Sequence, residues 1–563
     1  MRNTRLLERN LATHAADPTA QNLATPEAPW WRGAVIYQIY PRSFNDTNGD
    51  GVGDLAGIIE RLDYVANLGV DAIWVAPFFK SPMADFGYDI ADYRAVDPLF
   101  GSLAEFDALL ARAHRLGLKV MIDQVLSHTS IEHEWFKESR NSRDNPKADW
   151  YVWADARADG TPPNNWMSIF GGVAWRWEPR RGQYYLHNFL SSQADLNFHH
   201  PAVRRAVIEV VRFWLERGVD GLRLDAINFC FHDRQLRDNP AKPVEQRVGR
   251  GFSPDNPYAF QYHQFNNTQP ENLGFLAELR DLLDQFPGAV SLGEISSEDS
   301  LATMAEYTTD RGLHMAYSFE LLTEDFSASH FRQTVQRLEA QMPAGWPCWA
   351  ISNHDVTRVL TRWGGARPPQ ALAKLLNTLL CSLRGSVCVY QGEELGLTEA
   401  EVPYECVQDP YGKAFWPKFK GRDGCRTPMP WTASAQAGFT VGQPWLPIPE
   451  AHRALAVAVQ DSDAASVLKH FRRLLHWRRS QPALITGAIR FVETPEPVLA
   501  LVRSTVEQRW LLAFNLSDQP VQVAMPAQGT LRLIESLELP SGNIQNGQLC
   551  LPAYGALIAL IAP

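Results

Sequence analysis

The chain has 563 residues, of which 45% are hydrophobic and 21% are charged. This mix is typical of a globular protein with several domains and excludes a disordered chain. The formal net charge is −10 and no long basic run occurs, which argues against a nucleic-acid partner.

Seven cysteines are scattered along the chain without a CxxC pair. This pattern argues against a zinc ribbon and favours reduced thiols in the cytoplasm. Residues 1–28 are predicted to form an N-terminal tail, and they contain no uninterrupted apolar core. The tail therefore resembles neither a signal peptide nor a membrane span, and no later stretch has the length of a membrane helix.

Eight short apolar runs follow the tail, separated by amphipathic helical stretches. Each run is apolar first and polar at its C-terminal end, as expected of a parallel strand buried on both faces. A helix is expected over 201–218, where Val203, Val207 and Trp214 fall on one face. Eight such units predict an α/β fold, a (β/α)8 TIM barrel, rather than a doubly wound sheet. The runs begin at Ala34, Val70, Lys119, Gly221, Ala289, Met315, Cys348 and Ser386.

Two regions interrupt or follow this repeat. Residues 129–198, rich in Trp, Pro, Gly and Asn, are predicted to form an inserted subdomain B over the barrel mouth after the third strand. The barrel itself is then expected at 29–128 and 199–480, with a long Pro- and Gly-rich loop after Gly396. Residues 481–563 contain short strands with turns, which predict a C-terminal β-sandwich.

Polar residues gather where the predicted strands end, and active sites of such barrels form at these ends. Each residue alone has a structural explanation, since a strand-end Asp is often a helix cap and a strand-end Glu often forms an ion pair. Taken together, the carboxylates, histidines and arginines favour a catalytic site. The set comprises Tyr40, Arg42, Tyr88, Asp89, Asp123, His128, Arg223, Asp225, Glu294, His354 and Asp355.

This set suits the cleavage of a glycosidic bond. Such a reaction needs an acid to protonate the leaving oxygen and a carboxylate to meet the anomeric carbon. Arg223 precedes Asp225 by two residues on one strand, so both side chains face the same way and the cation should keep Asp225 ionised. Glu294 lies in the apolar segment SLGEIS, which should raise its pKa and keep it protonated.

At these positions the sequence resembles the α-amylase family, glycoside hydrolase family thirteen, and within it bacterial α-glucosidases and oligo-1,6-glucosidases. The resemblance covers nearly all of the chain after Trp30. It rests on four ordered motifs: DQVLSH ending at His128, GLRLDA around Asp225, GEIS around Glu294 and SNHD ending at Asp355. A fifth segment, QADLNF, is similar to the QPDLN signature of the oligo-1,6-glucosidase branch.

The resemblance implies the role of each site residue. Asp225 is the expected nucleophile, Glu294 the acid/base and Asp355 the third catalytic carboxylate. His128, Arg223 and His354 are expected sugar ligands, Tyr88 the aromatic platform, and Asp89 with Arg426 the pair that closes the pocket around the non-reducing end. Two positions depart from the family pattern, because Ser127 replaces the usual Asn and Ala194 the usual Pro.

A second motif, DTNGDGVGD, resembles the start of an EF-hand loop. Oxygen donors occur at Asp46, Asn48, Asp50 and Asp54, with Val52 at the seventh position. The bidentate Glu of a sensor is missing, because Gly57 occupies its position. A structural Ca²⁺ site is therefore expected, and related α-glucosidases hold Ca²⁺ or Mg²⁺ here. The alternative is a turn-rich loop without metal.

The predicted function is a retaining, exo-acting α-glucosidase that hydrolyses maltose and short oligosaccharides and also transfers glucose to hydroxyl acceptors. No organic cofactor is implied, and a monomer or homodimer is expected. Ala226 follows the nucleophile, where the family has Val or Thr; its small side chain favours α-1,4 over α-1,6 linkages. The alternatives are a sucrose isomerase or trehalose synthase-like glucosyl transferase, a non-catalytic barrel subunit, and a calcium sensor.

Overall fold

The computed structural model describes residues 29–247, 255–365, 368–525, 530–534 and 537–562. The predicted tail at 1–28 lies outside the described residues. Among the helices that are described, none combines the length and the apolar character needed to cross a membrane.

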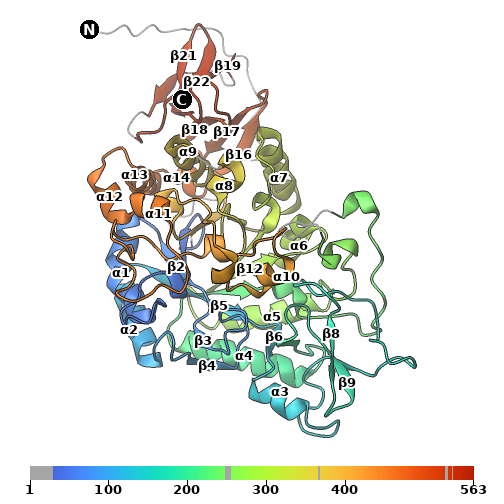
Figure 1. The fold of residues 1–563 in the computed structure, drawn as a ribbon. Helices are drawn as coiled ribbons and strands as arrows, with labels where there is room; N and C mark the ends of the chain where they lie inside the picture. The colour runs from blue at the N-terminus through green and yellow to red at the C-terminus, as the bar shows by residue number, and fades with distance from the viewer. Residues whose placement is uncertain (1–28, 248–254, 366–367, 526–529, 535–536, 563) are drawn as a thin grey trace.

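The centre of the molecule is an eight-stranded parallel sheet that curls into a barrel (Figure 1). The strands neighbour one another in chain order, and a single parallel bridge between Ala316 and Pro347 joins the sixth to the seventh. All eight predicted strands are confirmed, and all their residues are buried except the half-buried Lys119. The strands are β1 (Val35–Ile39), β2 (Ala72–Val75), β5 (Lys119–Val125), β11 (Gly221–Asp225), β12 (Val290–Ile295), β13 (Met315–Ser318), β14 (Cys348–Trp349) and β15 (Ser386–Tyr390).

Helices alternate with the strands and cover the outside of the barrel. The predicted helix over 201–218 is observed as α4 (Pro201–Glu216), capped by the His200 side chain and burying Val203, Val207 and Trp214. The others are α1 (Leu55–Leu68), α2 (Leu103–Arg115), α5 (Asn272–Leu283), α6 (Ser300–Tyr307), α7 (Ala328–Gln341), α8 (Val359–Gly364), α9 (Gln370–Leu380), α11 (Glu450–Ala454), α12 (Val457–Ser462), α13 (Val467–Arg479) and α14 (Pro482–Ile485).

The insertion after the third barrel strand forms a separate small unit. It contains α3 (Glu134–Ser139), a three-stranded sheet of β7 (Trp153–Ala154), β9 (Gln183–Leu186) and β8 (Trp175–Glu178), and the pair β6 (His128–Ser130) and β10 (Gln193–Asp195). Stacked Trp166 and Trp175 lie in its core. A hairpin of β3 (Phe79–Lys80) and β4 (Asp92–Val96) precedes it.

The C-terminal region packs two antiparallel sheets face to face, at the top of Figure 1. One contains β16 (Ala488–Val492), β17 (Val498–Ser504), β18 (Arg509–Asn515), β23 (Ala556–Ile561) and β20 (Leu531–Leu533); the other contains β19 (Val521–Ala524), β22 (Gln548–Leu551) and β21 (Asn543–Gln545). The predicted β-sandwich is confirmed.

The long loop that follows β15 returns across the barrel mouth. It contains a short α-helix, α10 (Pro410–Phe415), and short 3-10 helices such as Tyr404–Cys406 and Asp423–Cys425. This loop brings Tyr411, Arg422 and Arg426 to the same end of the barrel as the polar strand ends.

Candidate active site

A pocket opens at the carboxyl ends of the barrel strands. Its walls come from the barrel, from the insertion after β5 and from the loop that follows β15. The lining residues are Asp85, Tyr88, His128, Ile169, Phe170, Phe189, Gln193, Asp225, Ala226, Phe229, Glu294, Ser296, Phe319, Asp355, Val356, Tyr411 and Arg422. The polar members include the three predicted carboxylates, so the sequence motifs do converge on one cavity.

One fully buried arginine, Arg223 on β11, organises the floor of the pocket. Its Nη1 lies 2.7 Å from Asp225 Oδ1 and 2.8 Å from Asp123 Oδ1, and its Nη2 lies 2.5 Å from Glu294 Oε1. The Tyr317 hydroxyl accepts from Arg223 Nη2 at 2.8 Å and donates to Glu294 Oε1 at 2.8 Å. Sequence reasoning missed Tyr317. It lies on the strand after that of Glu294 and is its register partner, so aligning the ends of the two predicted strands would have indicated it.

Three buried carboxylates share this single cation, and that sharing sets their protonation. Burial raises the pKa of Asp225 to about 7 and that of Glu294 to about 7, although Arg223 opposes both shifts. The raised pKa expected for Glu294 is confirmed. The expectation that Arg223 keeps Asp225 ionised is wrong, because burial raises the pKa of Asp225 more than Arg223 lowers it, and Asp123 adds a like charge beside it. Near pH 7 the carboxyls of Asp225 and Glu294 therefore hold a proton between them.

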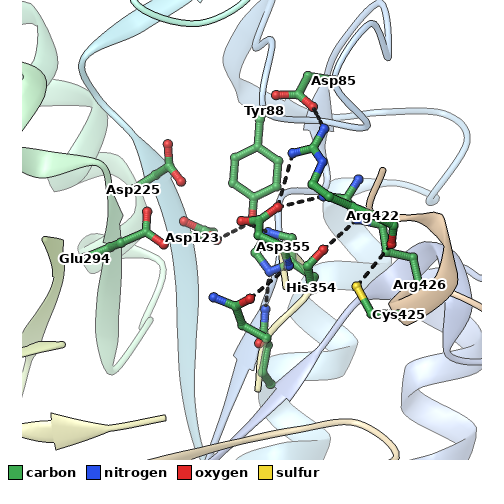
Figure 2. A network of polar contacts seen from close by, with 12 residues as sticks. Asp85, Tyr88, Asp123, Asp225, Glu294, His354, Asp355, Arg422, Cys425 and Arg426 are labelled. Atoms are coloured by element: carbon green, nitrogen blue, oxygen red, sulfur yellow. Dashed lines mark hydrogen bonds and ion pairs between the residues drawn. The ribbon is translucent and has the colours of Figure 1, made fainter. Parts of the chain in front are cut away.

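A second cluster surrounds Asp355, and in Figure 2 its two arginines, Arg422 and Arg426, lie on the side of Tyr88 away from Asp225 and Glu294. Arg426 Nη2 lies 2.7 Å and Arg422 Nη1 3.1 Å from Asp355 Oδ1. Burial opposes the ionisation of Asp355, but neighbouring cations lower its pKa. Because burial also lowers the pKa of His354 to about 3, this histidine is neutral near pH 7, and the two arginines supply the positive charge.

The predicted pair of Asp89 and Arg426 is not formed. Asp89 is fully buried and accepts hydrogen bonds from Ser81 Oγ and from the backbone N–H groups of Ala84 and Asp85. It shapes the turn that presents Tyr88 rather than facing the pocket. The ion pair at the pocket wall is instead Asp85 with Arg422, at 2.8 Å between Oδ1 and Nη2.

Three ring-bearing residues are packed together beside the pocket, and two of them, Tyr88 and His128, line it. Tyr88 stacks on His354 with ring centroids 5.2 Å apart, and its hydroxyl donates to Asp123 Oδ2 at 3.0 Å. Gln38 donates to His354 Nδ1 at 2.7 Å, so the Nε2 of that ring carries the proton toward Asp355. His128 Nε2 donates to the Tyr88 carbonyl at 3.0 Å. All three predicted residues therefore meet at one side of the cavity.

Ala226 directly follows Asp225 and lies beside the carboxyl cluster in the pocket wall. It lines the cavity and adopts a left-handed backbone conformation with φ 40° and ψ 45°. Its backbone N–H donates to Glu294 Oε2 at 3.1 Å. Because that conformation disfavours branched side chains, the residue after Asp225 affects both the space at the entrance and the strain of the turn.

The Asp46 loop lies between β1 and α1, and none of its residues lines the pocket. Asp46, Asn48 and Asp50 each accept from a backbone N–H two residues later, and Asp54 caps α1 through Gly57 N–H. No group of three or more His, Cys, Asp or Glu among the described residues is arranged to hold a metal by itself. The donors are all hard oxygens and fit Ca²⁺ or Mg²⁺, with the Asn48 amide and a carbonyl such as that of Val52 completing the set.

Comparisons with known proteins agree with this geometry. The family model described as the alpha amylase catalytic domain matches residues 38–487. A probable alpha-glucosidase of Rhizobium meliloti (strain 1021) is 54% identical over 97% of this chain and 99% of its own length. The crystal structure of the alpha-glucosyl transfer enzyme XgtA is 68% identical, with a TM-score of 0.94 over 95% of this chain and 100% of its own. The trehalulose synthase MutB from Pseudomonas mesoacidophila MX-45 is 34% identical, with a TM-score of 0.86 over 95% of this chain and 100% of its own.

Proposed function

The chain belongs to the α-amylase family of glycoside hydrolases, and from that membership we propose that it is a retaining, exo-acting α-glucosidase. The observation that supports this most directly is the Arg223 cluster. It holds Asp225 and Glu294 at the ends of adjacent strands, 2.7 and 2.5 Å from one guanidinium. Two carboxyls that share one proton near pH 7 supply the nucleophile and the acid that glycoside cleavage requires.

In the first step, the ionised Asp225 attacks the anomeric carbon while Glu294 gives its proton to the leaving glycosidic oxygen. The bond to that oxygen breaks and a glucosyl ester forms on Asp225. In the second step, Glu294 removes a proton from water and the resulting oxygen attacks the ester, which restores Asp225. Asp355, held ionised by Arg422 and Arg426, stabilises the positive charge that develops on the sugar ring.

Exo-action is supported by the Asp85–Arg422 ion pair in the pocket wall. The Asp85–Arg422 ion pair leaves charged hydrogen-bonding groups facing the cavity, where they suit the hydroxyls of a terminal glucose. Tyr88 supplies a flat ring that suits the apolar face of the same sugar. Asp85 and Arg422 take over the role that the sequence suggested for Asp89 and Arg426.

Transfer to hydroxyl acceptors is a further part of the proposal. The same ester on Asp225 can be attacked by an alcohol in place of water, with Glu294 again removing the proton. Ala226 leaves more space at the entrance than a branched residue would, which supports a preference for α-1,4 over α-1,6 substrates. The similarity to an enzyme described as transferring α-glucosyl groups also supports transfer activity.

A sucrose isomerase is the second candidate, favoured by the likeness to a trehalulose synthase. Such an enzyme would use the same carboxyls but return the released sugar to the glucosyl ester. Product chromatography on maltose, isomaltose and sucrose distinguishes the two. Glucose and transfer products from maltose, with retained anomeric configuration, are expected. Conversion of sucrose into an isomeric disaccharide as the main product would refute the glucosidase proposal.

We further propose a structural Ca²⁺ bound by Asp46, Asn48, Asp50, Val52 and Asp54. When bound, the ion would neutralise the carboxylates that crowd this loop and stabilise the start of α1. None of these residues lines the pocket, so the ion is assigned no step of the reaction.

A further inference from the structure

The loop after β15 contains a fully buried carboxylate, Asp409, which lies behind Arg422 and outside the described set of pocket-lining residues. Its Oδ1 lies 2.8 Å from Arg422 Nη2, and its Oδ2 lies 3.1 Å from Arg422 Nε. The same Oδ2 also accepts from the Arg422 backbone N–H at 2.7 Å. Two parallel bonds to a guanidinium edge fix its plane as well as its position.

With that edge held by Asp409, the rest of the guanidinium points toward the pocket. Nη2 also reaches Asp85 Oδ1 at 2.8 Å, and Nη1 reaches Asp355 Oδ1 at 3.1 Å. Asp85 and Asp355 both line the cavity, whereas Asp409 does not. The orientation of Arg422 is therefore set from outside the cavity, on the side away from the sugar.

Asp409 is itself held rigidly. Asp423 Oδ2 accepts from the backbone N–H groups of Gln408 and Asp409 at 2.6 and 2.9 Å. A side chain at Gly421, whose φ is +83°, would lie 2.7 Å from Asp409 Oδ2 and 2.6 Å from Gly412 Cα. The chain thus brings two loop segments so close that only glycine fits beside the carboxylate.

We propose that Asp409 is a positioning residue that presents Arg422 to the non-reducing end of the substrate and thereby sets recognition of the terminal sugar. The inference rests on the proposed function, in which Asp85 and Arg422 hold that end. Burial opposes the charge of Asp409, but Arg422 lowers its pKa to about 2, so the carboxylate is ionised at every pH at which the enzyme would be assayed.

A purely structural role is the competing explanation, because Asp409 also caps α10 through Tyr411 N–H at 3.2 Å. The two roles predict different results for Asp409→Asn. Asparagine caps a helix about as well as aspartate, so a capping role alone predicts little change. The charge of Asp409 acts chiefly on Arg422, and its second oxygen accepts hydrogen bonds from Arg422.

The test compares wild type with Asp409→Asn on maltose and on a maltose analogue that lacks the 4-hydroxyl of the non-reducing glucose. We expect KM for maltose to rise at least tenfold while kcat changes less than threefold. Wild type should discriminate against the analogue, and the variant should discriminate several-fold less. A variant with wild-type KM and wild-type discrimination would overturn the proposal.

A double-mutant cycle keeps the test decisive if the single variant is unstable. Arg422→Gln removes the group on which Asp409 is proposed to act, so adding Asp409→Asn to it should leave kcat/KM unchanged within twofold. Additive losses in kcat/KM would refute action through Arg422. Failure of both Asp409→Asn and the double variant to fold would also refute it, in favour of a structural role.

Asp233→Asn provides the matched control. Asp233 makes the same kind of bidentate pair with Arg237, at 2.9 and 3.0 Å, and accepts its backbone N–H at 3.1 Å. It does not line the pocket, so its variant should keep the wild-type KM and discrimination. If wild type itself failed to cleave maltose, the proposed function would fail instead, which separates the two outcomes.

Discussion

Replacing Glu294 by Gln should stabilise the protein at alkaline pH while it removes the proposed catalytic acid. Glu294 is buried, and burial raises its pKa from the ordinary 4.5 to about 7. A carboxyl whose pKa is raised on folding makes a contribution to stability that is fully present below pH 4.5. This contribution is lost as the pH rises to about 7, because the same carboxyl in the unfolded chain ionises at a lower pH than in the folded chain. At pH 8 the wild type therefore bears the full cost of a buried charge, and the amide does not.

The size of the effect follows from the pKa. Each pKa unit corresponds to about 1.4 kcal/mol, so a carboxyl whose pKa is raised from 4.5 to about 7 destabilises the folded state at pH 8 by about 3 kcal/mol. The amide can still accept from Arg223 and Tyr317 through its oxygen. Its NH₂ group then faces the Ala226 N–H, which Glu294 Oε2 accepts at 3.1 Å, and losing that bond costs about 1 kcal/mol. A net gain of about 2 kcal/mol remains.

The assay is the melting temperature of wild type and Glu294→Gln between pH 4 and pH 8. The variant should melt a few degrees above wild type at pH 8. Toward pH 4 this gain should disappear, and the loss of the Ala226 hydrogen bond should leave the variant slightly less stable than wild type. Glu278→Gln serves as the control, because it removes a surface carboxyl that pairs with Arg204 and should show no comparable difference. A wild type that is the more stable protein at pH 8, or a difference that does not vary with pH, would show that burial does not control this group.

Three further predictions concern catalysis, linkage and metal. Glu294→Gln should slow maltose hydrolysis far more than hydrolysis of activated aryl glucosides, whose leaving groups need no proton; equal losses in the two rates would refute the acid assignment. Ala226→Val should lower the ratio of kcat/KM for maltose over isomaltose, because the branched side chain restores a clash worth about 1–3 kcal/mol. An unchanged ratio refutes the steric argument, and melting curves control for strain at φ 40°. Chelation of a metal from the Asp46 loop should lower the melting temperature more than it lowers activity at room temperature. Reversible loss of turnover without loss of stability would instead indicate a catalytic metal.

The barrel could be predicted from sequence because its signal is local. Each strand is a short apolar run, and α4 shows a clear helical period between Pro201 and Gly218. The C-terminal sheets were predicted as a class, but β21 (Asn543–Gln545) is wholly exposed and has no apolar alternation to indicate it. A strand of that kind forms because its neighbour offers free backbone groups, which no residue pattern reveals.

The site was predictable where its residues follow a strand, and not where a loop supplies them. Asp225 and Glu294 are fixed by the ends of β11 and β12. The Asp85–Arg422 pair joins residues that are 337 positions apart, so no local pattern indicates it. Asp89 directly follows Tyr88 in the sequence, which makes it the obvious candidate when the turn geometry is not known. Only the turn geometry, in which Asp89 accepts backbone N–H groups, shows that this carboxylate faces inward and Asp85 faces the pocket.

Two arginines, each paired with three carboxylates, divide the chemistry of the pocket between its two ends. Around Arg223, burial raises the pKa of Asp123 to about 6 and those of Asp225 and Glu294 to about 7, because one cation cannot offset three buried negative charges. Around Arg422, burial acts in the same direction, yet the pKa values of Asp355 and Asp409 are lowered.

The difference between the two ends is one additional cation. Arg426 adds a second positive charge beside Asp355, so the carboxylates there stay ionised, whereas the Arg223 cluster retains a proton near pH 7. In the proposed mechanism, the transferable proton then lies beside the scissile bond and the permanent negative charge beside the ring that becomes cationic. Neutralising Arg426 should erase this asymmetry by raising the pKa of Asp355, even though Arg426 itself does not line the cavity.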